Sequence, residues 1–365
     1  MSVRQVEVAE AIRLRDTGFT VVDVREPVEW NSGHIPGAVH IPLGELPSRL
    51  ATDLPDHAAG VLLHCRSGAR SRRAAEFMAA SGYTGVVNYG GGLTDWQAAG
   101  GAWEEPAHAL TPDQERRYAR QLVLPEVGPD GQRRLLEARV LLLGAGGLGS
   151  PAALYLAAAG VGNLGIVDAD AVDESNLQRQ VIHRTADIGA SKVESAARAL
   201  AGLNPDVQVV KRAVRLNSGN ADDLLDGWDV VIDGSDNLET RYALNDAAVR
   251  RRVPVVHGSV YRWEGVVTTF VPVVGPCYRC LHPTMPPAEL FESCEVAGVL
   301  GVLPGIVGTL QATEAIKLIL GAGRTLVGRL LTIDARDMTL NEVALARDPA
   351  CPACGGAARA TAPPM

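Results

Sequence analysis

The sequence has few aromatic residues and no run rich in lysine and arginine. Phe, Trp and Tyr account for 4% of its 365 residues while hydrophobic residues reach 47%, a balance typical of an α/β protein rich in Ala, Val and Leu. The formal net charge of −8, without a basic stretch, argues against a nucleic-acid partner. Anionic ligands must therefore be held by local cations, against the overall field.

Long hydrophobic stretches are also scarce. Residues 1–16 have no apolar core, which argues against a signal peptide. The most apolar later stretch, residues 296–310, contains glycines and Pro304 and is followed by Glu314 and Lys317, so we expect a buried segment and no membrane span. We expect a cytoplasmic protein without a membrane partner, in which six cysteines indicate metal binding or catalysis before disulfides.

The length of the chain suits two domains. Early in the chain, compact apolar runs at 20–24 and 61–65 predict parallel strands, and a helical pattern covers 71–80. Residues 98–112 lack periodicity and carry Gly and Pro. The predicted organisation is a first domain over 1–103, a linker over 104–111 and a second domain over 112–365.

The second domain alternates strands and helices. Strands are predicted at 140–143, 164–167, 230–232 and 254–256, and helices at 150–159, 191–203 and 238–251. This alternation is typical of a doubly wound parallel sheet of the Rossmann type. The predicted fold class is therefore α/β in both domains.

Cys65 stands where a predicted strand ends and a glycine-containing loop leads into a helix. The amides of such a loop form a nest for anions, and the loop here consists of Arg66, Ser67, Gly68, Ala69 and Arg70. This setting favours a thiolate or a persulfide anion. A phosphatase is the rival interpretation, because His64 and Cys65 begin its signature, but Arg70 makes the loop one residue shorter than that signature requires. A buried core cysteine would explain neither the loop nor the arginines.

The first domain resembles the rhodanese family in four stretches, at residues 23–26 (DVRE), 33–38 (GHIPGA), 65–70 (CRSGAR) and 90–96 (GGGLTDW). The resemblance implies a sulfurtransferase domain in which Cys65 carries a persulfide received from a donor such as a cysteine desulfurase. It assigns Asp23 and Arg25 to support of the fold.

A glycine loop opens the second domain's first strand–helix unit. Gly144, Gly146 and Gly149 form G-x-G-x-x-G, and Asp168 ends the next strand, which together are the fingerprint of a dinucleotide site. An NAD-dependent oxidoreductase is one interpretation. However, Arg179 and Lys192 supply cations and Asp236 a carboxylate for magnesium, which a site that cleaves ATP at the α-phosphate requires.

The second domain resembles the MoeB/ThiF family of ubiquitin-activating-like adenylyltransferases in residues 117–121 (RYARQ), 144–149 (GAGGLG), 168–180, 189–192 (GASK), 233–237 (DGSDN) and 277–280 (CYRC). The resemblance implies ATP as substrate and an acceptor that is a ubiquitin-like sulfur carrier ending in Gly-Gly. It places Asp168 and Asp170 at the ribose and Asp236 at magnesium. Arg120 is expected to reach the active site of the other subunit of a homodimer. The remaining implied nucleotide residues are Gly144, Gly146, Gly147, Gly149, Asn176, Arg179, Gln180, Lys192 and Asn237.

The remaining cysteines form two C-x-x-C pairs and a single residue. Cys277 with Cys280 and Cys351 with Cys354 predict a closed tetrahedral zinc site of structural type, two redox dithiols being the alternative. Cys294 is left over. In the MoeB/ThiF resemblance it belongs to a crossover loop and can act as a second catalytic thiol, although the neighbouring glutamates should raise its pKa.

Together these features predict ATP-dependent adenylation of the carrier's C-terminal glycine, followed by sulfur transfer from Cys65 to give a thiocarboxylate. The domain order is reversed relative to the familiar fusions of these two families. An oxidoreductase fused to a sulfurtransferase and a non-catalytic sulfur-relay scaffold are the alternatives. Molybdopterin, thiamin, tRNA thiolation and cysteine pathways are all compatible with the sequence.

Overall fold

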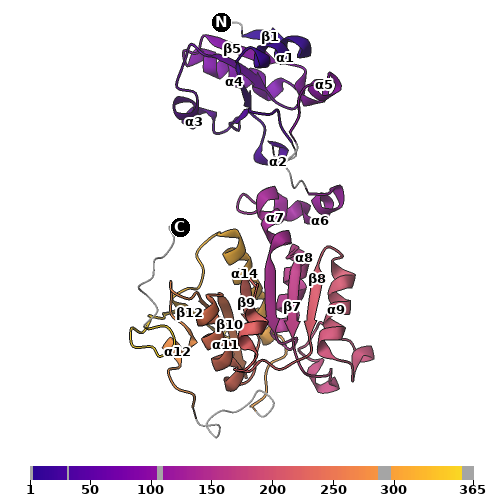
Figure 1. The fold of residues 1–365 in the computed structure, drawn as a ribbon, viewed down its shortest axis with the longest axis vertical. Coiled ribbons are helices and arrows are strands. Elements are labelled where there is room, and N and C mark those ends of the chain that lie inside the picture. The colour runs from indigo at the N-terminus through magenta and orange to yellow at the C-terminus, as the bar shows by residue number, and fades with distance from the viewer. Residues whose placement is uncertain (1–2, 31–32, 105–109, 287–296, 356–365) are drawn as a thin grey trace. The chain divides into compact units, whose positions relative to one another are not determined.

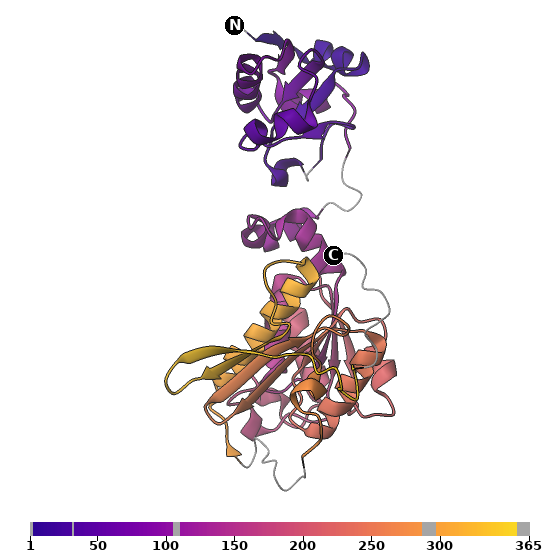
Figure 2. The same ribbon diagram turned by 90° about the vertical axis from the view of Figure 1, so that its left-hand side faces the viewer.

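The computed structural model describes residues 3–30, 33–104, 110–286 and 297–355, which fold into two compact units, residues 1–130 and 131–365. Each unit is an α/β structure built on its own sheet (Figures 1 and 2). The α/β class expected from the sequence is confirmed. The domain boundary at 104–111 stays a prediction, and residues 105–109 lie outside the described part of the chain.

A five-stranded parallel sheet organises the first unit. Its strand order is β1-β5-β4-β2-β3, with every neighbouring pair parallel. The predicted strands at 20–24 and 61–65 correspond to β2 and β4, and the sequence analysis did not identify the other three. The strands are β1 (Arg4–Val6), β2 (Thr20–Asp23), β3 (Val39–His40), β4 (Gly60–His64) and β5 (Gly85–Tyr89).

Helices cover both faces of this sheet. Because side chains alternate along a strand, Val61 and Leu63 of β4 face a core with α3 and α4, while Leu62 faces α1 and α5. Trp96 of α5 is fully buried and donates from Nε1 to the Ala102 carbonyl, 2.9 Å away. The helices of this unit's α/β fold are α1 (Val8–Asp16), α2 (Pro27–Trp30), α3 (Leu46–Asp53), α4 (Ala69–Ala80) and α5 (Gly92–Ala98). Two helices follow in the chain, α6 (Pro112–Leu122) and α7 (Gly128–Glu137), and the division between the units falls within α7.

The second unit has an eight-stranded sheet whose order is β13-β12-β11-β10-β9-β6-β7-β8. Five neighbouring strands of this sheet, β10, β9, β6, β7 and β8, are parallel to one another, as the alternation of strands and helices in the sequence predicts. The chain leaves β6 toward β7 on one side, and β9 lies on the other, so the order reverses between β6 and β9. In open α/β sheets such a switch point is where ligands bind, at the carboxyl ends of the strands. The parallel strands are β6 (Arg139–Leu143), β7 (Asn163–Val167), β8 (Gln208–Arg212), β9 (Val230–Asp233) and β10 (Val255–Tyr261).

The sheet continues into an antiparallel half that the sequence analysis did not predict. Strands β11 (Glu264–Phe270), β12 (Arg329–Asp334) and β13 (Thr339–Ala344) pair antiparallel with β10 and with one another. All six residues of β13 are exposed. A strand without a buried face has no need of the apolar alternation by which strands are recognised, which explains why β13 was missed.

The faces of the second sheet differ in their helices. Leu141, Val231 and Val255 face a core shared with α10 and α11, whereas α8, α9 and α14 pack on the opposite side. The observed α11 has the bounds predicted from the sequence, residues 238–251. The helices are α8 (Gly149–Ala159), α9 (Lys192–Leu203), α10 (Ala221–Leu225), α11 (Leu238–Arg251), α12 (Tyr278–Leu281) and α14 (Leu303–Leu320), with 3₁₀ turns η1 (Glu174–Asn176) and η2 (Thr185–Asp187).

Among the described residues there is one helix, α14, whose length and composition alone would allow it to cross a membrane. Its polar side chains are nevertheless used inside the unit. Gln311 donates from Nε2 to the carbonyls of Asp233 and Val256, at 2.8 and 3.0 Å, and thereby joins β9 and β10. The Glu314 carboxylate accepts from the Thr269 hydroxyl at 2.9 Å. These buried contacts are those of a core helix in a folded unit.

Candidate functional site

The Cys65 sulfur lies at the end of β4 inside a ring of hydrogen-bond donors. Its side chain is 1% exposed, and Sγ accepts from the Gly68 amide at 3.2 Å. Burial raises the pKa of the thiol, but hydrogen bonds from the Ser71 hydroxyl and from the amides of Ser71, Ser67 and Arg70 outweigh it, so the pKa is lowered overall. The sulfur thus lies among the loop amides from which the sequence predicts an anion nest, and the Ser71 hydroxyl beside it also contacts the Gly68 carbonyl at 3.2 Å.

Glycines shape this loop by close contact with a second glycine run. Gly68 has φ of +83° and caps α4, and a Cβ there would lie 2.4 Å from the Gly90 carbonyl oxygen. A Cβ on Gly92 would lie 2.0 Å from the Arg66 carbonyl oxygen. The stretch 90–92 therefore packs against the Cys65 loop backbone to backbone, which no other residue type allows.

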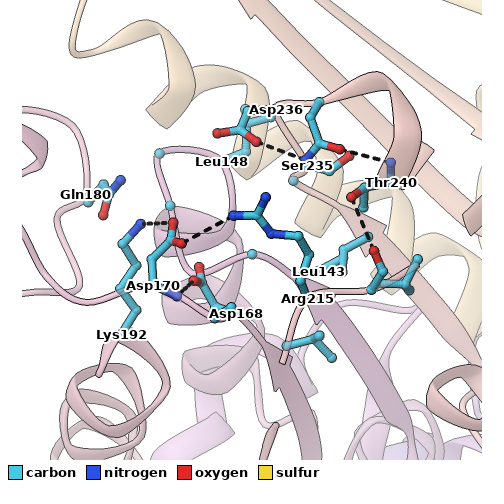
Figure 3. Close-up of a pocket in the computed structure, with 18 of the residues that line it drawn as sticks. Leu143, Leu148, Asp168, Asp170, Gln180, Lys192, Arg215, Ser235, Asp236 and Thr240 are labelled. Atoms are coloured by element: carbon cyan, nitrogen blue, oxygen red, sulfur yellow. Dashed lines mark hydrogen bonds and ion pairs between the residues drawn. The ribbon is translucent and has the colours of Figure 1, made fainter. Parts of the chain in front are cut away.

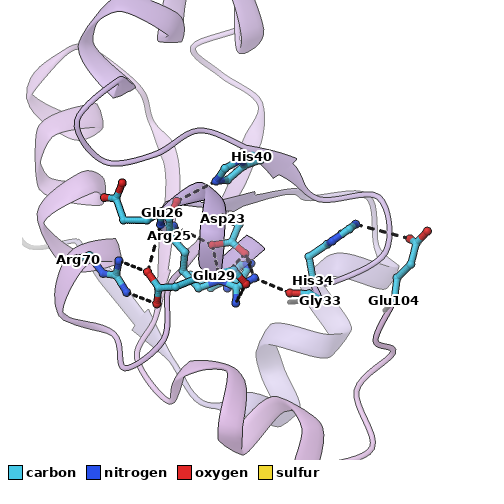
Figure 4. A network of polar contacts seen from close by, with 10 residues as sticks. Asp23, Arg25, Glu26, Glu29, Gly33, His34, His40, Arg70 and Glu104 are labelled. Carbon is cyan, nitrogen blue, oxygen red and sulfur yellow. Dashed lines mark hydrogen bonds and ion pairs between the residues drawn. The ribbon is translucent and has the colours of Figure 1, made fainter. Parts of the chain in front are cut away.

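The guanidinium of Arg70 forms an ion pair with Glu29, an acid far from it in the sequence, as Figure 4 shows. Its two terminal nitrogens donate to the two carboxylate oxygens of Glu29 on α2, at 2.6 and 2.7 Å. The hydrogen bond to Arg70 holds the pKa of Glu29 below its usual range, so the pair is ionic at neutral pH. Arg70 belongs to the predicted loop, whereas no sequence motif marks Glu29 as its partner.

A second ion pair supports the fold beneath the loop. Arg25 binds the fully buried Asp23 through Nε, at 3.0 and 2.8 Å, and reaches the carbonyls of Glu29 and Gly33 (Figure 4). It thus ties the end of β2 to α2 and to the following turn. Burial lowers the pKa of His64 to about 4, so the residue before Cys65 is neutral and adds no cation to the nest.

A pocket lies in the second unit at the switch point between β6 and β9 (Figure 3). The cavity volume of this pocket is about 150 Å³, and it opens to solvent. The glycine loop after β6 forms one wall, with Gly144 at φ of +98°. A Cβ on Gly149 would lie 1.9 Å from the Gly144 carbonyl oxygen, which fixes glycine at the first residue of α8. Gly149 itself does not line the pocket, whereas Gly144, Gly146 and Gly147 do.

Acids and a lysine face each other across this pocket (Figure 3). The Asp168 carboxylate accepts from the amides of Ala145 and Asp170, both at 2.8 Å, and so links the end of β7 to the glycine loop. Lys192, which is 6% exposed, donates from Nζ to Asp170 at 3.0 Å. A buried lysine held by one exposed carboxylate is a cation that an anionic ligand can approach.

The other predicted residues divide between lining and support. Arg179, Gln180, Asp236 and Asn237 line the pocket, and Gln180 is buried with its Oε1 unpaired. Asn237 uses its side-chain oxygen to cap α11, accepting from the Thr240 amide at 2.9 Å. Asn176 lies in η1, bonds to the Ser175 hydroxyl and does not line the pocket. Asp236 is exposed, as a ligand for a hydrated cation would be.

Sequence reasoning missed His183, which fixes the glycine loop from behind. Its Nε2 lies 2.9 Å from the Ala145 carbonyl and its Nδ1 lies 2.8 Å from the Ser195 hydroxyl, which also contacts Asp187 at 2.8 Å. A carbonyl only accepts, so Nε2 carries the proton. Because Asp168 accepts from the Ala145 amide, both the N–H and the C=O group of Ala145 are hydrogen-bonded. Arg215 and Arg241 also line the pocket and were not predicted, since no motif marks them.

The four predicted metal ligands meet in the second unit. The sulfur atoms of Cys277, Cys280, Cys351 and Cys354 all lie within 4.8 Å of one another, and two pairs of them are 3.5 Å apart. Tetrahedral zinc with bonds of about 2.3 Å places its sulfurs roughly 3.8 Å apart, so the spacing fits. The Asp348 amide donates to the Cys280 sulfur at 3.4 Å, as an outer-shell group would. The cluster could hold a metal ion.

Two predicted residues remain outside these sites. Arg120 is exposed in the last turn of α6. Cys294 lies outside the described residues.

The fold and the two centres define a class of protein in which one unit holds a cysteine sulfur among loop amides and the other has a glycine-loop pocket at a doubly wound switch point. Residues 118–353 match the ThiF family and residues 7–99 match the rhodanese-like domain. The chain belongs to the ThiF family and carries a rhodanese-like domain ahead of the ThiF region.

Relatives at high identity match about two thirds of the chain. The SAMP-activating enzyme E1 of Haloferax volcanii is 53% identical over 247 residues, which cover 68% of this chain and 91% of that protein. The sulfur carrier protein adenylyltransferase of Thermus thermophilus is 48% identical, covering 67% and 92%. The probable adenylyltransferase/sulfurtransferase MoeZ of Mycobacterium tuberculosis is 50% identical over 252 residues, which cover 68% of this chain and 64% of MoeZ.

Solved structures agree with this fold. Escherichia coli MccB bound to MccA-N7isoASN superposes with a TM-score of 0.60 at 22% identity, covering 70% of this chain and 78% of that one. The same enzyme with ATP has a TM-score of 0.59 at 23% identity, covering 66% and 75%. At this identity the likeness establishes the fold alone.

The lowered pKa of Cys65 predicts a pH dependence of its alkylation. Because the thiolate reacts, the rate with iodoacetamide should rise with pH and reach half its maximum below the ordinary thiol pKa of 9.0. Ser71→Ala removes a hydroxyl donor and should move this midpoint to higher pH. Ser67→Ala, which keeps the donating amide, is the matched control. Peptide mapping would identify the labelled cysteine, and an unmoved midpoint in Ser71→Ala would contradict the role of the hydroxyl.

The His183 contacts predict a loss of nucleotide affinity when the ring is removed. His183→Ala removes one of the two side-chain donors to the Ala145 carbonyl, the other being the Ser150 hydroxyl at 3.4 Å, and should weaken ATP binding about tenfold, the equivalent of one lost hydrogen bond in a buried loop. His183→Asn, which keeps a side-chain N–H, should retain part of the affinity. Calorimetric titration with ATP would measure both, with His57→Ala in the first unit as control. Equal affinity in wild type and His183→Ala would show that the loop does not depend on this contact.

Proposed function

We propose that the protein is an adenylyltransferase and sulfurtransferase that activates the C-terminal glycine of a ubiquitin-like sulfur carrier with ATP and then transfers sulfur to it from a Cys65 persulfide. The names of the relatives support both activities, and those of Haloferax volcanii and Thermus thermophilus point to small protein substrates. The observation that carries the proposal is the presence of both centres in one chain: a glycine-loop pocket with a buried lysine, and a sulfur held by loop amides.

The first step takes place in the pocket between β6 and β9. The carrier carboxylate attacks the α-phosphate of ATP, the bond to the bridging oxygen breaks, and pyrophosphate leaves. Arg179 and Lys192 offset the charge that develops on the phosphates, and the Gln180 amide donates to them. Asp168 and Asp170 hold the ribose hydroxyls. Asp236 would bind Mg²⁺, which offsets phosphate charge when it is present.

The second step uses the nest around Cys65. The terminal sulfur of the persulfide attacks the acyl carbon of the adenylate, and AMP leaves with the electron pair of the broken bond. A thiolate, from Cys294 or an external reductant, then attacks the Cys65 sulfur and forms a new disulfide with it, while the old S–S bond breaks and its electron pair leaves on the carrier thiocarboxylate. A persulfide on the same chain, or on a partner subunit, reaches the adenylate at high effective concentration.

Three further assignments complete the proposal. The four-cysteine cluster holds a structural Zn²⁺ that joins the start of α12 to the segment after β13. The protein acts as a homodimer in which Arg120 reaches the partner's pocket. A cysteine desulfurase, or another persulfide enzyme, loads Cys65. Adenylation is favoured over the oxidoreductase alternative because the relatives are named adenylyltransferases.

Removing the Cys65 sulfur should separate the two activities. Cys65→Ala should leave carrier-dependent ATP–pyrophosphate exchange within about twofold of wild type, since adenylation uses no thiol. The same variant should make no thiocarboxylate from a persulfide donor, as mass spectrometry of the carrier would show. Asp236→Ala should do the reverse, losing exchange on the order of a thousandfold while Cys65 still accepts sulfur. Thiocarboxylate formation at the wild-type rate by Cys65→Ala would refute sulfur delivery through this residue. Absence of carrier-dependent exchange in the wild-type protein would favour the non-catalytic scaffold.

The cysteine cluster predicts metal content and stability together. The purified protein should contain about one zinc per chain, because four thiolates close a tetrahedral site. Cys351→Ser should lose the metal and unfold at lower temperature, whereas Cys294→Ser should change neither. Metal analysis and thermal unfolding with and without a chelator would measure this. Full zinc occupancy in a Cys351→Ser, Cys354→Ser double variant would refute the assignment.

A further inference from the structure

The Cys65 loop contains a cation whose charge is already matched. Arg70 is the last residue of the loop, and its amide is one of the donors to the Cys65 sulfur. Its guanidinium makes a two-point ion pair with Glu29, which stands 41 positions earlier in the chain. The hydrogen bond to Glu29 is the main cause that raises the pKa of Arg70, and an ionised Cys65 raises it further, so the guanidinium also interacts with the sulfur.

Two kinds of group near Cys65 can attract an anion, and the ion pair with Glu29 affects only one of them. The amides and the Ser71 hydroxyl act at short range on a single sulfur atom. The guanidinium fork could bind a planar oxyanion through two parallel hydrogen bonds, but Glu29 occupies this position. Arg66, the residue after Cys65, is exposed, and among the residues that the structure describes no carboxylate pairs with it as Glu29 pairs with Arg70. The site therefore favours a sulfur anion over a group that carries several charged oxygens.

This distinction separates two classes of sulfur donor. With thiosulfate, the Cys65 thiolate attacks the outer sulfur, an S–S bond forms, and the old S–S bond breaks with its electron pair to release sulfite, which carries two charges on oxygen. With a persulfide RSSH, the thiolate attacks the terminal sulfur and RS⁻ leaves, so no oxyanion develops. Only the first reaction needs an additional cation beside the loop.

We propose that Glu29 is a specificity-determining residue: by holding the Arg70 guanidinium, it makes the Cys65 site a poor acceptor of sulfur from thiosulfate and directs it to persulfide donors. The proposal rests on the proposed function, in that Cys65 must carry the sulfur. It adds the chemical class of the donor and the residue that selects it.

The test compares two donors on the full-length protein in single-turnover experiments. Persulfide formation on Cys65 is followed by intact mass with excess thiosulfate and, separately, with excess cysteine persulfide. Glu29→Gln keeps the size of the side chain and removes its charge, so the rate ratio of thiosulfate to persulfide should rise about tenfold or more. Glu76→Gln, the same charge change on an exposed part of α4, is the matched control and should leave the ratio unchanged.

Two further variants show where a gain comes from. Adding Arg70→Gln to Glu29→Gln should abolish the gain, because the freed guanidinium is its source. Sulfite should inhibit persulfide formation on Glu29→Gln at a lower concentration than on wild type. This gives a second readout that does not depend on the rate with thiosulfate. Glu29→Asp keeps the charge and should stay near the wild-type ratio, so a loss of folding in one variant does not leave the question open.

The outcomes distinguish a failure of the role of Glu29 from a failure of Cys65 as the sulfur carrier. An unchanged ratio in Glu29→Gln with wild-type sulfite inhibition would overturn the role of Glu29 while leaving Cys65 as the carrier. A gain that persists without Arg70 would equally overturn it. If Cys65→Ala still accepts sulfur from either donor, the proposed function itself fails.

Discussion

Both chemical centres depend on one backbone constraint: a buried parallel strand must turn into a helix within a few residues, with its amides facing the ligand. At Cys65 the turn is pressed against the Gly90–Gly92 run, and at the nucleotide pocket it is pressed against its own carbonyl at Gly144. A side chain at Gly92 or Gly149 would overlap backbone oxygen at 2.0 and 1.9 Å. The positions of the donors, and hence the affinity of each centre for an anion, follow from the absence of these Cβ atoms.

Charge is then added locally, in a protein with a net charge of −8. In each centre a cation is paired with a carboxylate before any ligand arrives: Arg70 with Glu29 and Lys192 with Asp170. Pairing lowers the cost of burying the cation and keeps its position fixed. It also means that a ligand must compete with, or be bound alongside, the resident acid. The two centres differ in this respect, since Glu29 contacts both terminal nitrogens of its partner whereas Asp170 is largely exposed and makes one contact with Lys192.

Much of the fold could be predicted because buried parallel strands and amphipathic helices leave clear patterns. The strands β6, β7, β9 and β10 and the helix α11 were found in this way, and the motifs identified the glycine loop and the Cys65 loop. The exposed β13 has no such pattern and was missed. Residues that act from a distance in the chain were missed for a different reason. Glu29 and His183 belong to no motif with their partners Arg70 and Ala145, and only the folded chain brings them together.

The polar contacts of α14 have a consequence for how the chain is made. A helix of this length and apolarity, emerging alone, resembles a segment that a membrane-insertion machinery would accept. Its Gln311 and Glu314 raise the cost of that route, Glu314 by about 3 kcal/mol if it were placed at mid-membrane. The strands on which α14 packs, β9 to β11, all precede it in the chain. When the helix leaves the ribosome, the carbonyls and hydroxyl that receive its polar groups have already been synthesised, so a folding surface is available to it before a lipid one.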